Sequence, residues 1–156
     1  MLPLPQTYAT WLAAFRIYSG IFWLLHGVPK ILNPNFAQPD GMMANMVREA
    51  SAGTSGAYHD FLVHVVLPNA ALFGHLVAWG ETLTGVSLLL GLLTRLGGLV
   101  GVFLPLNYWL MKGGVSDPTS FGSLDWAAIA LSFVSLVLPT GIVLGLDAYL
   151  ARGRRR

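Results

Sequence analysis

The sequence predicts an all-α integral membrane protein: a four-helix bundle with a helical extracytoplasmic loop between its first and second helices. Of its 156 residues, 54% are hydrophobic and only 10% are charged, whereas soluble domains carry about 25% charged residues. Four segments are apolar and long enough to cross a bilayer: about 11–29, 71–93, 96–112 and 124–146. One four-helix transmembrane domain thus accounts for residues 1–156.

The first predicted span ends near Pro29 and Pro34, and the connection that follows it, up to Asn69, is the longest outside the bilayer. It contains a candidate amphipathic helix, Met42–Ala50, and a second short helix, Tyr58–Leu67, that Pro68 is expected to end. We expect the apolar side of the first of these to lie on the bilayer or to cap the bundle. An ordinary connecting loop is the alternative.

The second and third spans are joined only by a tight turn around Thr94 and Arg95, which predicts an antiparallel hairpin. The fourth span follows a loop that ends at Ser123, a residue type that commonly caps helices. Small residues recur at the spacing that brings transmembrane helices close together. These are Gly97 and Gly101 in the third span, and Gly141 and Gly145 in the fourth.

The distribution of positive charge predicts the topology. Four of the nine Lys and Arg residues are Arg152, Arg154, Arg155 and Arg156, directly after the last span. In that position they are a topology anchor, so no nucleic-acid partner is expected. The start of the chain has no features of a secretory signal, so we expect the first span to remain a helix. The interpretation is a multi-pass membrane protein with both termini cytoplasmic and residues about 31–69 and 113–123 outside.

Glu81 lies near the middle of the second span, where a carboxylate costs about 2.5–3.5 kcal/mol on insertion scales. With a rise of about 1.5 Å per residue, Glu81 and Asn107 both lie roughly 18 Å from the cytoplasmic side. Arg16 lies roughly 8 Å deep, His26 roughly 24 Å deep, and Lys30 at the outer boundary. We therefore expect a central polar layer in which Glu81 contacts Arg16, His26 or Asn107, directly or through water.

The helical periodicity agrees with this layer. Residues Arg16, Gly20, Trp23, Gly27 and Lys30 share one face of the first span, and Glu81 shares its face with Gly74, Ala78 and Gly85. Small residues beside a buried carboxylate leave room for a neighbouring helix, a ligand or water. One interpretation is a polar pocket within the bundle. The other is a structural Arg16–Glu81 ion pair with Asn107 hydrogen-bonded nearby.

Cysteine and histidine usage bears on redox chemistry. The absence of cysteine excludes a thiolate-ligated iron–sulfur cluster and a dithiol relay within this chain. His26 and His75 lie at similar depths, as bis-histidine haem ligation requires, and Asp60 and His64 are one helical turn apart. No haem-attachment motif is present. We therefore predict no metal site, and the roles of His59, His64 and His75 stay open.

Two stretches resemble the DoxX/DoxD-like family of small membrane proteins. The run from Arg16 through His26 to Lys30 is similar to the first helix of that family. The run from Glu81 to Gly85, continuing to Gly91–Arg95, resembles its second helix and the turn that follows. The resemblance implies a four-helix bundle in a bacterial or archaeal inner membrane. Some members of that family are described as subunits of thiosulfate:quinone oxidoreductase, while most have no established activity.

Three functions compete. The first is a quinone-linked redox subunit that works with a partner oxidoreductase, in which quinone is the expected cofactor. Glu81 and His26 are its candidate catalytic residues, and its candidate binding residues are Arg16, Trp23, Lys30 and Asn107. The second is a non-catalytic accessory subunit of a larger membrane complex, whose polar layer holds the helices together. The third is a small transporter or lipid-binding protein. The expected partners are the lipid bilayer and other membrane or extracytoplasmic subunits.

Overall fold

A computed structural model describes residues 6–153, and every regular element in that part of the chain is helical. The predicted all-α class is confirmed for these residues. The α-helices are α1 (Gln6–Leu32), α2 (Met42–Ser51), α3 (Gly56–Phe61), α4 (Ala70–Leu90), α5 (Thr94–Met111), α6 (Leu124–Val137) and α7 (Asp147–Gly153). Shorter turns are the π-helical η1 (Leu62–Val66) and the 3-10 segments η2 (Leu67–Asn69), η3 (Gly114–Ser116), η4 (Pro118–Gly122) and η5 (Thr140–Ile142).

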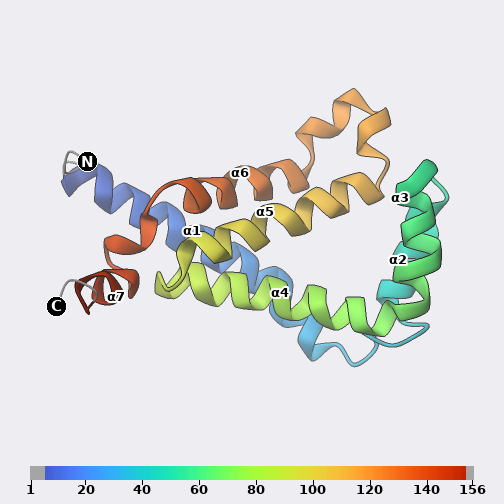
Figure 1. The fold of residues 1–156 in the computed structure, drawn as a ribbon, viewed down its shortest axis with the longest axis horizontal. Coiled ribbons are helices and arrows are strands. Elements are labelled where there is room, and N and C mark those ends of the chain that lie inside the picture. The colour runs from blue at the N-terminus through green and yellow to red at the C-terminus, as the bar shows by residue number, and fades with distance from the viewer. Residues whose placement is uncertain (1–5, 154–156) are drawn as a thin grey trace.

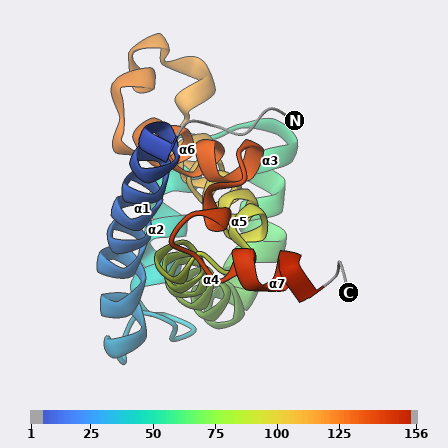
Figure 2. The same cartoon turned by 90° about the vertical axis from the view of Figure 1, so that its left-hand side faces the viewer.

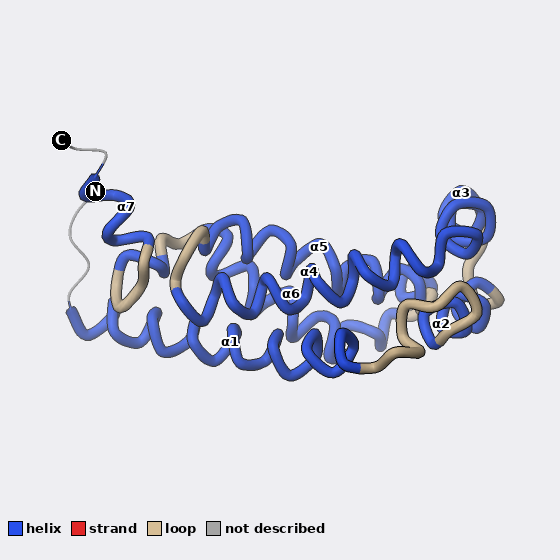
Figure 3. Tube along the Cα trace, turned by 90° about the horizontal axis from the view of Figure 1, so that it is seen from below, coloured by secondary structure: helices blue, strands red, loops and turns tan. Residues whose placement is uncertain are grey.

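Four long helices form the body of the molecule. Helix α1 packs mainly on α4, α5 packs mainly on α6, and α4 and α5 form a hairpin that joins the two pairs (Figure 1). The end-on view of Figure 2 shows α1, α4, α5 and α6 arranged around a common centre. Helices α2 and α3 lie at one end of the body, and α7 lies at the other, the end at which α1 begins (Figure 3).

Glycine allows the backbones within each pair to touch. A Cβ atom on Gly27 of α1 would lie 2.5 Å from the backbone nitrogen of Thr82 in α4. A Cβ on Gly98 of α5 would lie 2.5 Å from the backbone nitrogen of Leu136 in α6. Because real Cβ atoms do not approach backbone so closely, only glycine permits these crossings. Close approach of this kind is typical of helices that associate in lipid.

The fourth predicted span, 124–146, is too long. Helix α6 ends at Val137, Leu138 has an extended backbone, and Pro139 precedes the short segment η5. A proline disfavours the helical conformation at the residue before it, and here Leu138 leaves the helix, although α1 and α5 continue through Pro29 and Pro105. Consequently Gly141 and Gly145 lie beyond α6 and do not form the predicted helix-packing pair.

The long connection between α1 and α4 is folded and covers one end of the body. Helix α2 agrees with the predicted Met42–Ala50 helix. The second predicted helix does not end at Pro68, because α3 continues through η1 and η2 directly into α4. Pro68 lies in the 3-10 segment η2, directly after the π-helical η1. The hydrogen-bond pattern changes there, so the helical run tolerates the missing N–H group of the proline. Buried side chains of this connection, including Phe36, Met43 and Leu62, join Val77 and Met111 in one hydrophobic cluster.

The continuous helical run Gly56–Leu90, 35 residues long, is the one helix in the described chain that is long and apolar enough to cross a membrane by length and composition. Helix α6 is apolar but shorter. Large apolar side chains are nevertheless exposed along all four long helices. They include Trp11, Leu25, Leu76, Leu83, Leu99, Phe103 and Phe133.

Candidate functional site

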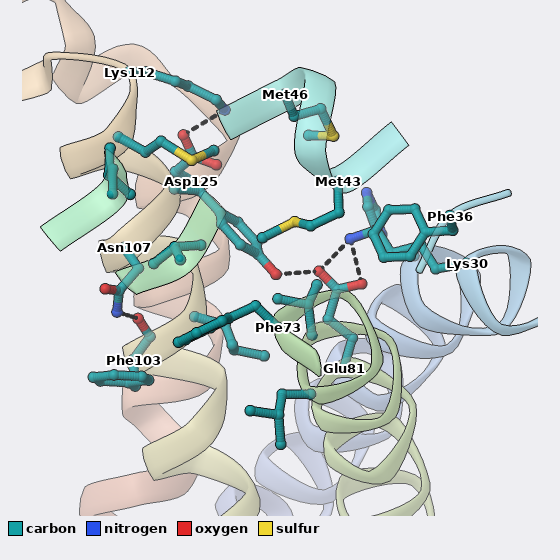
Figure 4. Close-up of a pocket in the computed structure, with 18 of the residues that line it drawn as sticks. Lys30, Phe36, Met43, Met46, Phe73, Glu81, Phe103, Asn107, Lys112 and Asp125 are labelled. Carbon is teal, nitrogen blue, oxygen red and sulfur yellow. Dashed lines mark hydrogen bonds and ion pairs between the residues drawn. The ribbon is translucent and has the colours of Figure 1, made fainter. Parts of the chain in front are cut away.

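Glu81 is buried, with only 1% of the residue exposed, and both oxygens of its carboxylate accept hydrogen bonds. Lys30 of α1 donates to both Glu81 oxygens at 2.5 Å, and the hydroxyl of Tyr108 on α5 donates to Oε1 at 2.7 Å (Figure 4). The Lys30 ammonium also lies 5.6 Å and 5.5 Å from the ring centres of Phe36 and Tyr108, within the range of cation–π attraction. Three elements thus meet at one charged cluster.

The packing of α1 on α4 explains why Lys30 reaches Glu81. Gly27 sits directly against the backbone of Glu81 and Thr82, and Lys30 is one turn further along the same face. The long aliphatic stem of lysine then carries its ammonium over the carboxylate. Arg16, by contrast, lies 11 residues before Gly27, which is about 16 Å along the helix axis. The predicted contact of Glu81 with Arg16 is therefore wrong, and so is the alternative of a structural Arg16–Glu81 pair.

A cavity of about 390 Å³ adjoins this cluster, a volume within the range of small-molecule sites, roughly 300–1,000 Å³. It lies between the four long helices and the α2–α3 connection, and Lys30 and Glu81 form part of its wall. Most of the remaining wall is apolar, with aromatic and methionine side chains such as Phe36, Met43 and Phe73. A mostly apolar cavity with a few convergent polar groups is the usual pattern of a ligand site.

A second ion pair lines the same cavity. Lys112, just after α5, donates to Oδ2 of Asp125 at 2.8 Å, and Asp125 is only 7% exposed. Asp125 lies in the first turn of α6, where the helix dipole favours a negative charge. In Figure 4 the Lys112–Asp125 pair and the Lys30–Glu81 pair are both visible in the cavity wall. The cavity therefore presents two charged pairs on an apolar surface.

Two further predicted site residues line the cavity but do not touch Glu81. His26 is exposed, and its Nδ1 lies 2.8 Å from the carbonyl oxygen of Phe22. Because a carbonyl oxygen only accepts, Nδ1 is the donor in this hydrogen bond. The amide of Asn107 donates to the carbonyl oxygen of Phe103 at 2.7 Å. Neither His26 nor Asn107 hydrogen-bonds directly to Glu81 as predicted, although both residues share its cavity.

Arg16 belongs to a different part of the molecule. Its side chain is fully buried and donates to the carbonyl oxygens of Leu88 and Leu144, both at 2.9 Å. These bonds tie α1 to the end of α4 and to the segment after α6. At the same end, the Asp147 carboxylate accepts hydrogen bonds from the backbone nitrogens of Leu93 and Thr94, at the start of α5. Arg16 thus holds the α4–α5 turn rather than a ligand.

Trp23 also lies away from the cavity wall. It is 2% exposed, and its Nε1 donates to the hydroxyl of Ser132 on α6 at 3.0 Å. A Cβ on Gly101 of α5 would lie 3.1 Å from this nitrogen, so the indole fills a gap that glycine leaves open. Trp23 therefore connects α1 to the α5–α6 pair.

The outer histidines make local contacts. Nδ1 of His59 lies 3.0 Å from the carbonyl oxygen of Ser51, and Nδ1 of His64 lies 3.0 Å from the carbonyl oxygen of Asp60. His75 is exposed. Among residues 6–153, no group of three His, Cys, Asp or Glu side chains is placed to hold a metal ion.

Four polar residues of the cavity were not predicted from the sequence: Tyr58, Tyr108, Lys112 and Asp125. Tyr108 follows Asn107, and the periodicity of α5 is too weak to show which of the two faces inward. Lys112 and Asp125 lie at the ends of the third and fourth predicted spans, next to a loop, where charged residues are usually solvated. The sequence signal for this pair is the opposite charge of the two residues that flank the loop 113–123.

Fold and site together define a small all-helical protein whose long apolar helices enclose a buried ion pair beside a ligand-sized cavity. The family model for DoxX matches residues 11–114, from α1 to just beyond α5, so the chain belongs to the DoxX family. The DoxX proteins are membrane proteins. Neither the curated proteins nor the solved structures compared with the chain include a match. The match covers Lys30, Glu81 and Tyr108, and it leaves α6 and α7 outside.

Proposed function

We propose that this DoxX protein is the membrane subunit of a quinone-linked oxidoreductase and that the cavity beside Glu81 binds the quinone ring. In this proposal α1, α4, α5 and α6 form a four-helix bundle across a bacterial or archaeal inner membrane, with both termini cytoplasmic. The Arg residues on which that topology depends, from Arg152 onward, lie outside the part of the chain whose side chains are described. The exposed apolar residues on all four helices support a lipid surrounding.

The cavity carries this proposal. Its volume of about 390 Å³ accommodates a ring, and its walls offer aromatic faces and flexible methionines. An ammonium has three hydrogens, and Lys30 uses two of its three on Glu81. The third remains available to a carbonyl oxygen on a ligand. A bundle packed solidly around Glu81, with no room for a ring, would favour a purely structural role. The cavity beside Glu81 instead supports a ligand site.

A bound quinone supplies an acceptor of two electrons and two protons. The residues of this chain provide the proton side of that reaction. Tyr108 and Lys30 hold protons within hydrogen-bond distance of Glu81, and His26 lines an exposed part of the cavity wall. General acid–base groups act within hydrogen-bond reach of the reacting atom, so a ring bound beside Glu81 would lie close to these groups. A partner redox protein delivers the electrons in this proposal.

The accessory-subunit role is the second candidate, and one observation favours it. Both Glu81 oxygens already have partners, with Lys30 and Tyr108 supplying three hydrogen bonds. A carboxylate satisfied in this way can serve purely to fix α1, α4 and α5 relative to one another. The third role, transport or lipid binding, would use the same cavity without a redox step.

Quinone titration of the purified protein in lipid nanodiscs tests the proposal. We expect saturable binding that falls at least tenfold in the Glu81→Gln and Tyr108→Phe variants. The matched control is Thr84→Val, which alters a buried polar residue of α4 that lies outside the cavity wall. It should bind like the original chain. If the original chain binds no quinone and carries none from the membrane, the accessory role replaces the redox role.

A further inference from the structure

The cavity has an apolar opening between α4 and α5. Leu76 of α4 and Phe103 of α5 both line the cavity, yet they are 57% and 60% exposed. A side chain that lines a cavity and is also more than half exposed lies at its mouth. The two helices touch at Gly80, where a Cβ would lie 3.3 Å from Cδ1 of Leu104. Leu76 is one turn further along α4, away from the α4–α5 turn.

The other side of this opening is closed by α3. The hydroxyl of Tyr58 donates to the backbone carbonyl of Asn107 at 3.0 Å, which ties α3 to α5. The ring of Phe61 packs edge-on against Phe73 of α4, with ring centres 6.3 Å apart. The opening is therefore a window bounded by α4, α5 and α3. Phe73 lines the cavity and lies near Glu81 in the view of Figure 4.

The surface around this window is apolar. The exposed large residues of α4 near it are Leu72, Leu76 and Trp79, and those of α5 are Leu99 and Phe103. In a bundle that spans the bilayer, this surface faces lipid chains. Elsewhere the cavity reaches the exterior at His26 on α1 and near the start of α6, where Lys112 and Leu124 line it and are exposed. These other openings include the charged side chain of Lys112, whereas the window between α4 and α5 is bounded by apolar side chains.

We propose that the ligand of this cavity is a ring bearing one long apolar chain, such as an isoprenoid or alkyl chain. It enters from the bilayer, and the chain lies in the window between Leu76 and Phe103. The oxygen-bearing head lies at Lys30 and Glu81, and the chain continues into the hydrocarbon. This inference rests on the proposed quinone function and adds the chemical class of the ligand and its route. It also predicts that a ring without a chain binds more weakly.

The test compares two quinones with the same ring, one without a chain and one with a chain of two or three isoprene units. Binding is measured in nanodiscs, with each concentration expressed as a mole fraction in the lipid so that partitioning cancels. The chain-bearing quinone should bind at least tenfold more tightly. Leu76→Trp narrows the window and should remove that advantage while leaving the chainless quinone unaffected.

Leu83→Trp is the matched control. Leu83 lies two turns from Leu76 on the same face of α4 and is equally exposed, at 58%, but it does not line the cavity. It should leave both affinities unchanged. The window proposal is overturned if both quinones bind equally, or if Leu76→Trp and Leu83→Trp behave alike. The quinone proposal survives either of these results.

If neither quinone binds, the proposed function fails, and a second measurement still decides on the window. A phospholipid with a photoreactive diazirine in its acyl chain is activated in the nanodisc, and the adducts are mapped by mass spectrometry. An open window predicts adducts on Val77 or Leu104, which line the cavity, but none on Leu88, which is buried elsewhere. Leu76→Trp should reduce the cavity adducts several-fold. Adducts restricted to exposed residues would refute a route from the bilayer.

Discussion

At the scale of single residues, the account rests on Glu81 and the two groups that hydrogen-bond to it. A carboxylate with 1% exposure is tolerated because Lys30 and Tyr108 together give it three hydrogen bonds. The Lys30 side chain, 24% exposed, keeps its charge partly in contact with the exterior. The pair is thus asymmetric, with the anion buried and the cation near the cavity surface.

Removing Lys30 alone should be more harmful than removing both partners. Lys30→Met leaves Glu81 buried without its counter-charge, and breaking a buried pair costs about 3–5 kcal/mol. We expect the lower end of that range because Lys30 is partly exposed. The double variant Lys30→Met/Glu81→Met should recover most of the loss. Unfolding in detergent measures both, and equal losses in the single and double variants would show that the pair contributes little.

The sequence was sufficient to predict that Glu81 is buried, because a charge in an apolar span has few alternatives. It was not sufficient to predict the partner. Helical periodicity places Arg16 and Lys30 on one face of α1, but only the contact of Gly27 with Thr82 shows which of them lies level with Glu81. The tilt and height of one helix relative to another depend on packing between helices. The periodicity within one helix therefore cannot predict them.

At the scale of elements, glycine contacts set how closely the long helices pair. Gly27 meets backbone of α4, whereas Gly80 faces only the flexible ends of Leu104 and Val100. Two glycines within long helices, Gly27 and Gly80, therefore have different roles. The same scale shows why the fourth span was predicted too long: hydropathy continues past Pro139, but Leu138, the residue before it, leaves the helix.

Gly27→Ala should destabilise the protein, and Gly80→Ala should not. An added methyl at Gly27 would lie 2.5 Å from backbone, so α1 and α4 must separate, and overpacking of this kind costs about 1–3 kcal/mol. At Gly80 the nearest atom is a leucine methyl group at 3.3 Å, and alanine gains up to about 1 kcal/mol in helix propensity. Thermal unfolding of both variants checks this. A similar melting temperature for the two would contradict the pairing of α1 with α4 through glycine.

At the scale of the whole molecule, the proposed bundle has two chemically different ends. The α2–α3 connection covers the cavity end, and the α4–α5 turn, with Arg16 and Asp147, forms the other. The sequence predicted this general arrangement from the order of apolar segments and the length of the first connection. The shape of the cavity could not be predicted from the sequence. It is the space between the four long helices and the α2–α3 connection, so it depends on how these five parts of the chain pack together.

Labelling of single cysteines should place these two ends on opposite sides of the membrane. The chain has no cysteine, so Ser55→Cys beside α3 and Arg95→Cys in the first turn of α5 each give one reactive site. Both positions are exposed. In intact spheroplasts, a membrane-impermeant thiol reagent should label Ser55→Cys alone, and Arg95→Cys should react only after the membrane is opened. Labelling of both sites from the outside would refute the proposed topology.

Photoaffinity labelling with a diazirine on the quinone ring tests the central claim most directly, because it reports where a ring binds. The account predicts adducts on cavity residues from several elements, such as Met43 of α2, Leu104 of α5 and Phe73 of α4. Excess unlabelled quinone should suppress these adducts, and Glu81→Gln should reduce them. Adducts found only on lipid-facing residues such as Leu99, and not displaced by unlabelled quinone, would contradict the cavity as a ligand site.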